Sequence, residues 1–143
     1  MSLETGIYTI QSKSTQYHVG RFYIEDLSLR PKRVMSLSQN VGAKPPHWLI
    51  EKTGDTYRLK ALDAYTAVLE GKLFAIHLSE PEPVDWVINA HPEQGDNVYS
   101  IETENGSGWT VVAGDENDPE AQIEIHPVHQ DASNQLFTLV KLS

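Results

Sequence analysis

Apolar and polar side chains alternate along short stretches of this chain, and helical spacing is hard to find. Residues 7–10 and 99–101 show the alternation, and Gly, Pro, Asn and Asp residues separate such runs. A period of two places successive side chains on opposite faces of a strand. The pattern therefore predicts an all-β chain.

The runs recur as a unit of four strands that appears three times. Aromatic residues lead the first two strands of each unit, which cover residues 7–10 and 17–19, then 57–59 and 65–68, then 99–101 and 109–112. The third strands cover residues 34–37, 73–78 and 122–126. The fourth begin at Trp48, Trp86 and Phe137 and cover residues 48–50, 86–88 and 137–140.

Three units of four strands predict a β-trefoil, in which six of twelve strands close a barrel and three hairpins cap it. We expect one domain over residues 1–143, with repeats at about 6–52, 53–90 and 91–142. A β-sandwich also has short strands with regular turns, but it does not require a threefold aromatic register. We expect Trp48, Trp86 and Phe137 to occupy equivalent core positions.

The link between the second and third strands differs among the three units. It is a tight turn in the second unit and an acidic loop in the third. In the first unit it is longest, spans residues 20–33 and contains both apolar and basic side chains. Pro31 favours an extended Arg30. We expect residues 22–24 to pack on the barrel and residues 25–30 to be exposed, as suits insertion into a partner's groove.

Composition excludes several kinds of function. The 143 residues include no cysteine, so disulfides, thiolate zinc sites and thiol nucleophiles are ruled out. The net charge of −9 argues against a nucleic-acid partner. The beginning of the sequence has no pattern of a secretory leader, and no run of about 20 apolar residues indicates a membrane partner. We therefore expect a soluble, cytoplasmic protein.

Motifs for catalysis, metals and cofactors are weak. His126 and His129 flank Pro127 without an evident third ligand, so we expect no metal site. Residues 115–118 lack the glycine and the final glutamate of a calcium loop. Asn105 and Gly106 are typical of a hairpin turn. No nucleophile elbow is present. The sequence predicts a protein that is not an enzyme and needs no cofactor.

Several segments resemble the cospin-type serine protease inhibitors of basidiomycete mushrooms, which are similar to the mycocypins. The resemblance rests on the opening MSLETG followed by Tyr8, the step Val19-Gly20-Arg21, and the run EDLSL at residues 25–29 with PKRV at residues 31–34. It extends to the strands at Trp48 and Trp86, and so covers most of the chain.

The resemblance implies a β-trefoil inhibitor of serine proteases of the trypsin, chymotrypsin or subtilisin type. It implies that the loop between the second and third strands enters the protease's active-site cleft, and that Leu27 lies near the position that fills the primary pocket. An apolar Leu27 favours chymotrypsin or subtilisin; Arg30 suits trypsin but precedes Pro31, which lacks an N–H. Lys32 and Arg33 rank third as pocket residues, because we expect them to lie close to the strand that follows. The predicted protease-binding residues are Glu25, Asp26, Leu27, Ser28, Leu29 and Arg30.

Two alternatives remain open from the sequence. Related mushroom trefoils inhibit asparaginyl endopeptidases through an asparagine in the turn between the fifth and sixth strands, but residues 61–64 contain none. The chain could instead be a carbohydrate-binding lectin of the ricin type, since residues 135–137 weakly echo the Gln-x-Trp signature of those proteins. Trp109 or Tyr65 would then stack on a sugar, although both hold core-like positions. We expect a monomer in either case.

Overall fold

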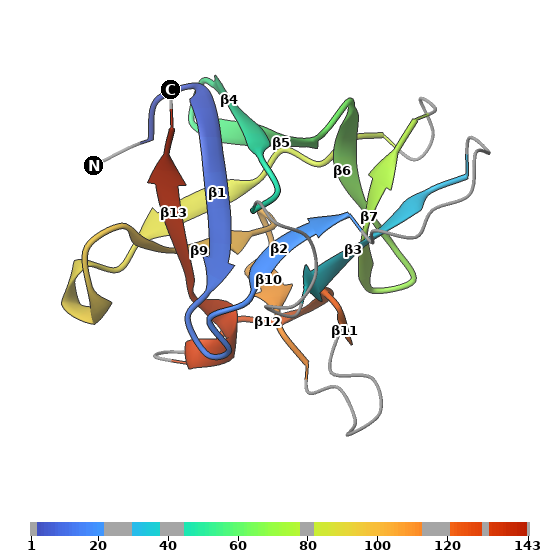
Figure 1. Cartoon of the computed structure of the whole chain (residues 1–143). Helices are drawn as coiled ribbons and strands as arrows, with labels where there is room; N and C mark the ends of the chain where they lie inside the picture. The colour runs from blue at the N-terminus through green and yellow to red at the C-terminus, as the bar shows by residue number, and fades with distance from the viewer. Residues whose placement is uncertain are drawn as a thin grey trace.

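A computed structural model describes residues 3–21, 30–37, 45–77, 82–112, 121–129 and 132–142. These residues form thirteen strands and two 3-10 helices (Figure 1). The strands are β1 (Gly6–Ser12), β2 (His18–Arg21), β3 (Lys32–Leu37), β4 (Trp48–Thr53), β5 (Thr56–Ala61), β6 (Ala64–Leu69), β7 (Lys72–Ile76), β8 (Val87–Ala90), β9 (Val98–Glu102), β10 (Ser107–Thr110), β11 (Ala121–Gln122), β12 (Glu124–Pro127) and β13 (Phe137–Lys141). The helices are η1 (Pro92–Gln94) and η2 (Ser133–Gln135).

The prediction of an all-β chain is confirmed, and the described strands differ from the predicted twelve at one place. The expected strand at residues 122–126 is divided into β11 and β12 by Ile123, whose backbone N–H donates to Val34 while its carbonyl accepts from Leu73. Ile123 is fully buried. The backbone of Ile123 is therefore hydrogen-bonded to both β3 and β7, at the point where β11 ends and β12 begins.

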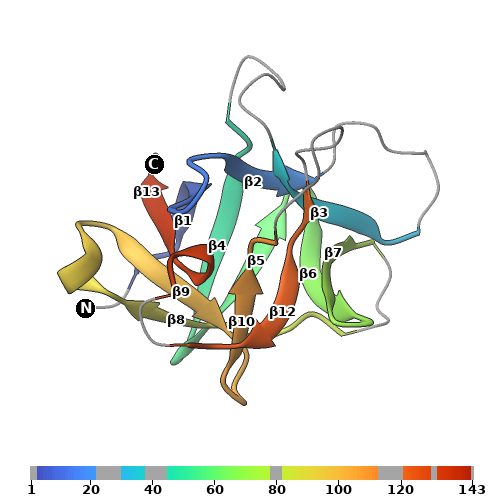
Figure 2. The same cartoon turned by 90° about the horizontal axis from the view of Figure 1, so that it is seen from below.

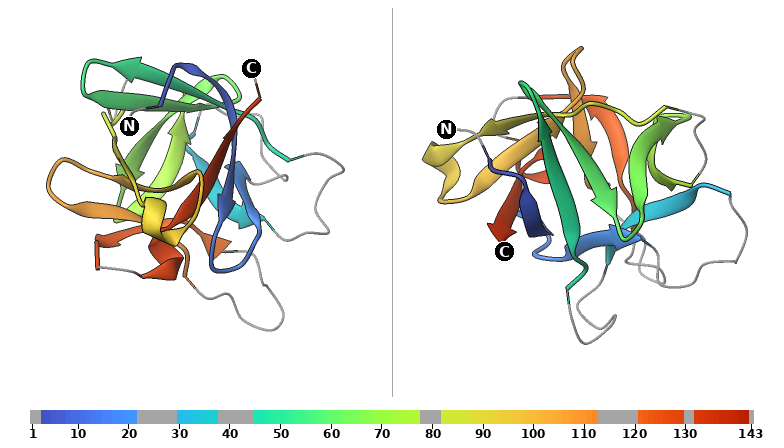
Figure 3. Two further views of the ribbon diagram at one scale, coloured as in Figure 1. Left: turned by 90° about the vertical axis from the view of Figure 1, so that its left-hand side faces the viewer. Right: turned by 90° about the horizontal axis from the view of Figure 1, so that it is seen from above.

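Six strands close a circuit by backbone pairing. Pairing runs from β1 to β4, β5, β8, β9 and β13, and β13 pairs with β1 again (Figure 3). The step from β5 to β8 is a single bridge, in which Tyr57 and Trp86 exchange backbone hydrogen bonds of 2.8 and 2.7 Å. Closure leaves none of these six strands as an open sheet edge.

The remaining strands form three hairpins that meet one another. They are β2–β3, β6–β7 and β10–β12. Strand β3 pairs with β7, β7 pairs with β12, and β11 pairs with β3, so the third strands of the three units contact one another in a ring (Figure 2). This ring places β3 beside β7, and Arg21 at the end of β2 contacts Asp63, so both elements meet the second unit.

The core contains the aromatic side chains that the sequence pattern predicts. Trp48, Trp86 and Phe137 are all completely buried, which confirms their predicted core positions. Trp109 of β10 lies among them, with ring-centroid distances of 5.6, 5.5 and 6.1 Å respectively. The two other indoles are hydrogen-bonded, Trp48 to the Val19 carbonyl and Trp86 to the Thr66 hydroxyl. One aromatic cluster thus joins the three units.

No helix in the described part of the chain has the length and apolar character needed to cross a membrane.

Candidate functional site

The predicted protease-binding segment lies between β2 and β3. Glu25, Asp26, Leu27, Ser28 and Leu29 lie outside the described residues, as do residues 22–24. Arg30 is described and is exposed, as predicted, and so is Pro31. The two ends of the segment, at Arg21 and Lys32, are both described. They define how it is attached to the barrel.

Arg21 holds the first end against the second unit. Its guanidinium Nη1 donates to the Asp63 carboxylate at 3.0 Å and to the Ala61 carbonyl at 3.4 Å, and Nη2 lies 3.3 Å from Nε2 of His77. The side chain of Arg21 is only 9% exposed. Because a guanidinium can only donate, His77 Nε2 accepts in this contact, and the ring proton lies on Nδ1, 4.0 Å from Asp63.

The second end is held by strand pairing. Val34 pairs with Arg21, and β3 continues beyond β2 so that Lys32 and Arg33 pair with Ala75 and Phe74 of β7. Lys32 is buried and Arg33 is exposed. The expectation that these two basic residues lie close to the strand is confirmed, since both belong to it. Residues 22–31 therefore join two ends that are fixed to β7 and to the β5–β6 turn.

Gly20 allows a close approach at the first end. A Cβ atom at this position would lie 2.5 Å from Cγ of Pro46, well inside van der Waals contact. Any side chain at residue 20 would push the segment before β4 away from β2. The glycine of the Val19-Gly20-Arg21 step is thus required by packing beside the predicted binding segment.

We predict that the contact between Arg21 and Asp63 makes stability depend on pH under acidic conditions. The hydrogen bond from Arg21 holds the pKa of Asp63 below its ordinary value. A carboxylate with a lowered folded pKa contributes stability above its unfolded pKa of about 3.9, and this contribution is lost as the pH falls through the folded pKa. Asp63→Asn is expected to be less stable than wild type at pH 7 and equally stable at strongly acidic pH.

Denaturant unfolding of the two proteins at several pH values measures this difference. Asp55→Asn, in the exposed β4–β5 turn, is the control for removal of one carboxylate charge. A difference between wild type and Asp63→Asn that is unchanged between pH 7 and strongly acidic pH would contradict the prediction.

Serine, histidine and glutamate side chains meet at the β8–β9 hairpin in the order of a hydrolase triad, which the sequence motifs do not indicate. His91 Nε2 lies 2.9 Å from the Ser100 hydroxyl, and His91 Nδ1 lies 3.5 Å from Glu93. However, the Ser100 hydroxyl donates to Glu102 at 2.5 Å and the residue is 2% exposed. A buried hydroxyl whose proton is directed at a carboxylate is not an activated nucleophile. The cluster is a structural hydrogen-bond chain.

The residues that suggested sugar binding have other roles. Gln135, in η2, is buried, and its amide donates to the Thr110 hydroxyl and the Pro127 carbonyl while its oxygen accepts from the His129 N–H. Trp109 is fully buried, as its core-like position predicted. Tyr65 is only half-buried, which corrects the expectation of a core position. Its ring nevertheless already has the cationic ends of Arg58 and Lys60, both in β5, beside it.

We predict that Gln135→Ala lowers the free energy of unfolding by about 1–3 kcal/mol, because buried hydrogen-bonding groups lose their partner. Thermal or denaturant unfolding measures this change. If Gln135 is structural, as its three hydrogen bonds indicate, the variant and the wild type should give the same result on a glycan array. An unchanged stability, or a glycan signal that the substitution abolishes, would contradict this role.

The described strands form a closed circuit, and the link between β2 and β3 is fixed at both ends, at Arg21 and at Lys32. A rigid scaffold that carries a loop between fixed ends is typical of proteins that bind a partner through that loop. The family model for peptidase inhibitor I66 matches residues 1–141, and the chain belongs to that family. It is 32% identical to a serine protease inhibitor of Lentinula edodes, with 99% of each chain covered. The resemblance that the sequence suggested is thereby confirmed.

Solved structures agree with this assignment. The proteinase inhibitor from Coprinopsis cinerea matches with a TM-score of 0.86 and 33% identity, covering 99% of this chain and 100% of that one. A ricin B-like lectin of Macrolepiota procera, solved with lactose, matches with a TM-score of 0.73 and 13% identity, covering 99% of both chains. At that identity the lectin and this chain share the fold alone.

Proposed function

We propose that this chain inhibits serine proteases by placing residues 25–30 in the enzyme's active-site cleft. The family match over residues 1–141 carries this proposal. It is supported by the two relatives whose names describe inhibitors of proteases and by the attachment of the segment at both ends. An inhibitor of this kind needs no catalytic group of its own, in keeping with a chain that is not an enzyme.

Anchored ends favour tight binding. A loop loses conformational freedom when it binds, and the cost is smaller if much of that freedom is already lost in the free protein. Arg21 fixes one end through Asp63, and the pairing of Lys32 with Ala75 fixes the other. Protease–inhibitor contacts of about 800 Å² per partner are among the tightest known, so such preorganisation has a large effect.

We propose Leu27 as the side chain that fills the primary specificity pocket. An apolar residue suits the pockets of chymotrypsin- and subtilisin-type proteases better than a trypsin pocket with its buried carboxylate. Arg30 is exposed but precedes Pro31, whose nitrogen carries no hydrogen for a substrate-like backbone contact. Arg30 therefore ranks second as the pocket residue.

One titration panel tests the proposed function. Increasing amounts of the protein are added to trypsin, chymotrypsin, subtilisin and the cysteine protease papain, and the residual activity is measured. We expect stoichiometric inhibition of chymotrypsin or subtilisin and none of papain, together with no signal on a glycan array. Glycan binding without inhibition of any serine protease would favour a lectin and refute the proposal.

We further infer that the closed circuit of six strands and the ring of three hairpins constitute a β-trefoil with three repeats. The equivalent burial of Trp48, Trp86 and Phe137 at the fourth strand of each unit supports this assignment. So does the pairing of β3, β7 and β12 around one centre. We propose that the protein acts as a monomer, because a one-to-one complex with a protease requires only one copy of the loop. We also propose that it is cytoplasmic, since a chain without cysteine suits a reducing compartment.

A further inference from the structure

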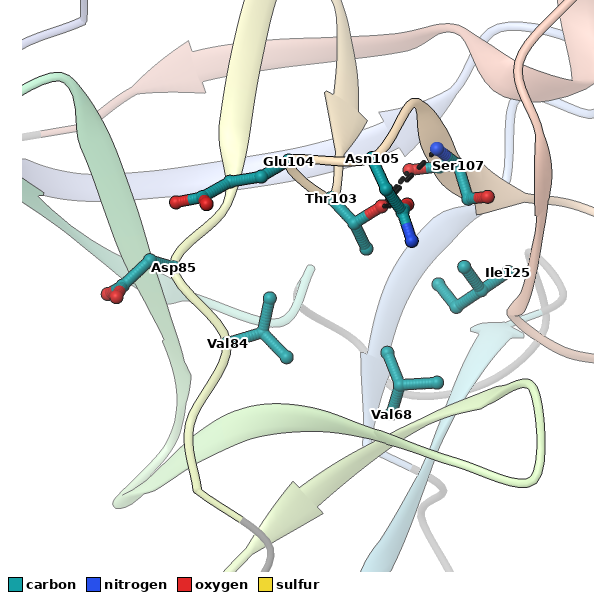
Figure 4. A pocket seen from close by; sticks show the side chains of 8 residues that line it. All are labelled: Val68, Val84, Asp85, Thr103, Glu104, Asn105, Ser107 and Ile125. Carbon is teal, nitrogen blue, oxygen red and sulfur yellow. Dashed lines mark hydrogen bonds between the residues drawn. The ribbon is translucent and has the colours of Figure 1, made fainter.

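A cavity of about 520 Å³ opens between the second and third units (Figure 4). Its floor consists of three branched aliphatic side chains, Val68 of β6, Val84 of the segment before β8, and Ile125 of β12. All three are partly buried and pack on the hydrophobic core. The floor therefore presents an apolar surface to solvent that no described residue covers.

The rim of the cavity is polar and lies mainly on the β9–β10 turn. The Thr103 hydroxyl donates to the side-chain oxygen of Asn105 and to the Ser107 carbonyl at 3.1 Å, and it accepts from the Ser107 N–H at 3.3 Å. These bonds fix the turn. They also engage the oxygen of the Asn105 side chain, so that its amide nitrogen points into the cavity (Figure 4).

The charged groups of the rim are both carboxylates. Glu104 is exposed and takes part in no ion pair within the described residues. Asp85 binds Nε of Arg58 through one oxygen at 2.9 Å. The eight described residues that line the cavity include no Lys, Arg or His. An apolar floor beneath two carboxylates matches a side chain with an aliphatic stem and a cationic end.

A second cavity of about 600 Å³ adjoins the first, because Asp85 lines both. It is polar and is lined among others by Thr56, Arg58 and Tyr65. Hydroxyl and charged groups of the second cavity can hydrogen-bond to the backbone of a partner peptide that extends from the first cavity past Asp85. The two cavities together have room for an extended peptide and not only for one side chain.

A sugar fits these cavities less well. The described residues that line the first include no aromatic ring on which a sugar could stack. In the second, the Tyr65 ring has Arg58 and Lys60 at 5.9 and 5.2 Å from its centroid, and its hydroxyl is bonded to Glu51 at 2.6 Å. Among the described residues that line the two cavities, Tyr65 is thus the single aromatic one, and its ring already has two cations beside it.

We propose that the cavity at Glu104 binds an arginine side chain from an extended basic segment of a partner protein. The stem of the arginine lies on Val68, Val84 and Ile125, and its guanidinium donates to Glu104 and to the oxygen of Asp85 that Arg58 leaves open. The net charge of −9 attracts a basic partner at long range. Among the described residues, neither Arg21 nor any of residues 30–37 lines this cavity.

Titration of the ¹⁵N,¹³C-labelled protein with the peptide acetyl-GGRGG-amide, followed by NMR, tests the proposal. We expect saturable shifts at the methyl groups of Val68, Val84 and Ile125 and at the Asn105 side-chain amide, with a dissociation constant of roughly millimolar order for so short a ligand. The same peptide with citrulline in place of arginine keeps the shape and loses the charge. It should bind at least about tenfold more weakly.

Two protein variants provide matched controls. Glu104→Gln is expected to weaken binding of the arginine peptide about tenfold while inhibition of a serine protease is unchanged. Glu93→Gln removes one negative charge at η1 and should leave peptide binding unchanged. Absence of shifts at the floor residues, equal binding of the citrulline peptide, or saturable shifts with lactose instead would each overturn the proposal.

Discussion

Replacement of Trp109 by alanine is expected to lower the free energy of unfolding by about 3–5 kcal/mol, the range for removal of a large buried aromatic side chain. Trp109 is completely buried, and its ring contacts Trp48, Trp86 and Phe137, one aromatic residue from each unit. The resulting cavity would open where the three units meet. No strand could close it without breaking the circuit of pairings.

Trp109→Phe is the informative companion to this variant. Within the described part of the chain the indole N–H of Trp109 is buried without a hydrogen-bond partner. Phenylalanine removes that N–H and keeps an aromatic ring, so its cost should be well below that of alanine. Denaturant unfolding of both variants measures the difference. A destabilisation by Trp109→Ala of less than about 1 kcal/mol would show that the cluster is not the centre of the core.

Substitution of Leu27 by glycine is expected to weaken inhibition of the target protease by about 100-fold or more, as removal of a central interface side chain does. The fold should be unaffected, because Arg21 and Lys32 hold the ends of the segment independently of residue 27. Inhibition constants from progress curves, with unfolding midpoints measured in parallel, separate the two effects. Leu62→Gly is the control, since Leu62 is the most exposed large apolar side chain described, at 72%.

An inhibition constant that is the same for wild type and Leu27→Gly would contradict the assignment of Leu27 to the pocket. A similar loss for Leu62→Gly would show that the β5–β6 turn contributes as much to the protease interface as the proposed segment does. If Leu27→Gly also lowered the unfolding midpoint substantially, the residue would be part of the core and not of the binding surface.

The repeat pattern predicts the fold well because it records which side chains face the core. Trp48, Trp86 and Phe137 recur at the same strand of each unit, and all three are buried. The pattern fails for the aromatic residues at the second strand. Trp109 and Tyr65 are equivalent in the repeat, yet Trp109 is central and Tyr65 is half-buried. Trp109 occupies the position between Trp48, Trp86 and Phe137, and repetition alone does not tell which second-strand aromatic residue lies there.

The contacts that hold the ends of the predicted binding segment could not be predicted in the same way, because the residues that make them lie far apart in the sequence. Composition drew attention to residues 20–33. Family membership confirms the resemblance, and the role of this segment stays a prediction. The contacts of Arg21 with Asp63 and His77 bridge 42 and 56 residues and follow only from the pairing of β3 with β7. The cavity at Glu104 likewise joins residues from two units. Neither feature leaves a local motif in the sequence.

The inhibition constants of Leu27→Arg for trypsin and chymotrypsin test most directly whether this segment occupies a protease's specificity pocket. Arginine complements the carboxylate at the base of the trypsin pocket, whereas leucine suits the hydrophobic pocket of chymotrypsin. The substitution is predicted to strengthen inhibition of trypsin and weaken that of chymotrypsin relative to wild type. Unchanged constants for both enzymes would show that residue 27 enters neither pocket.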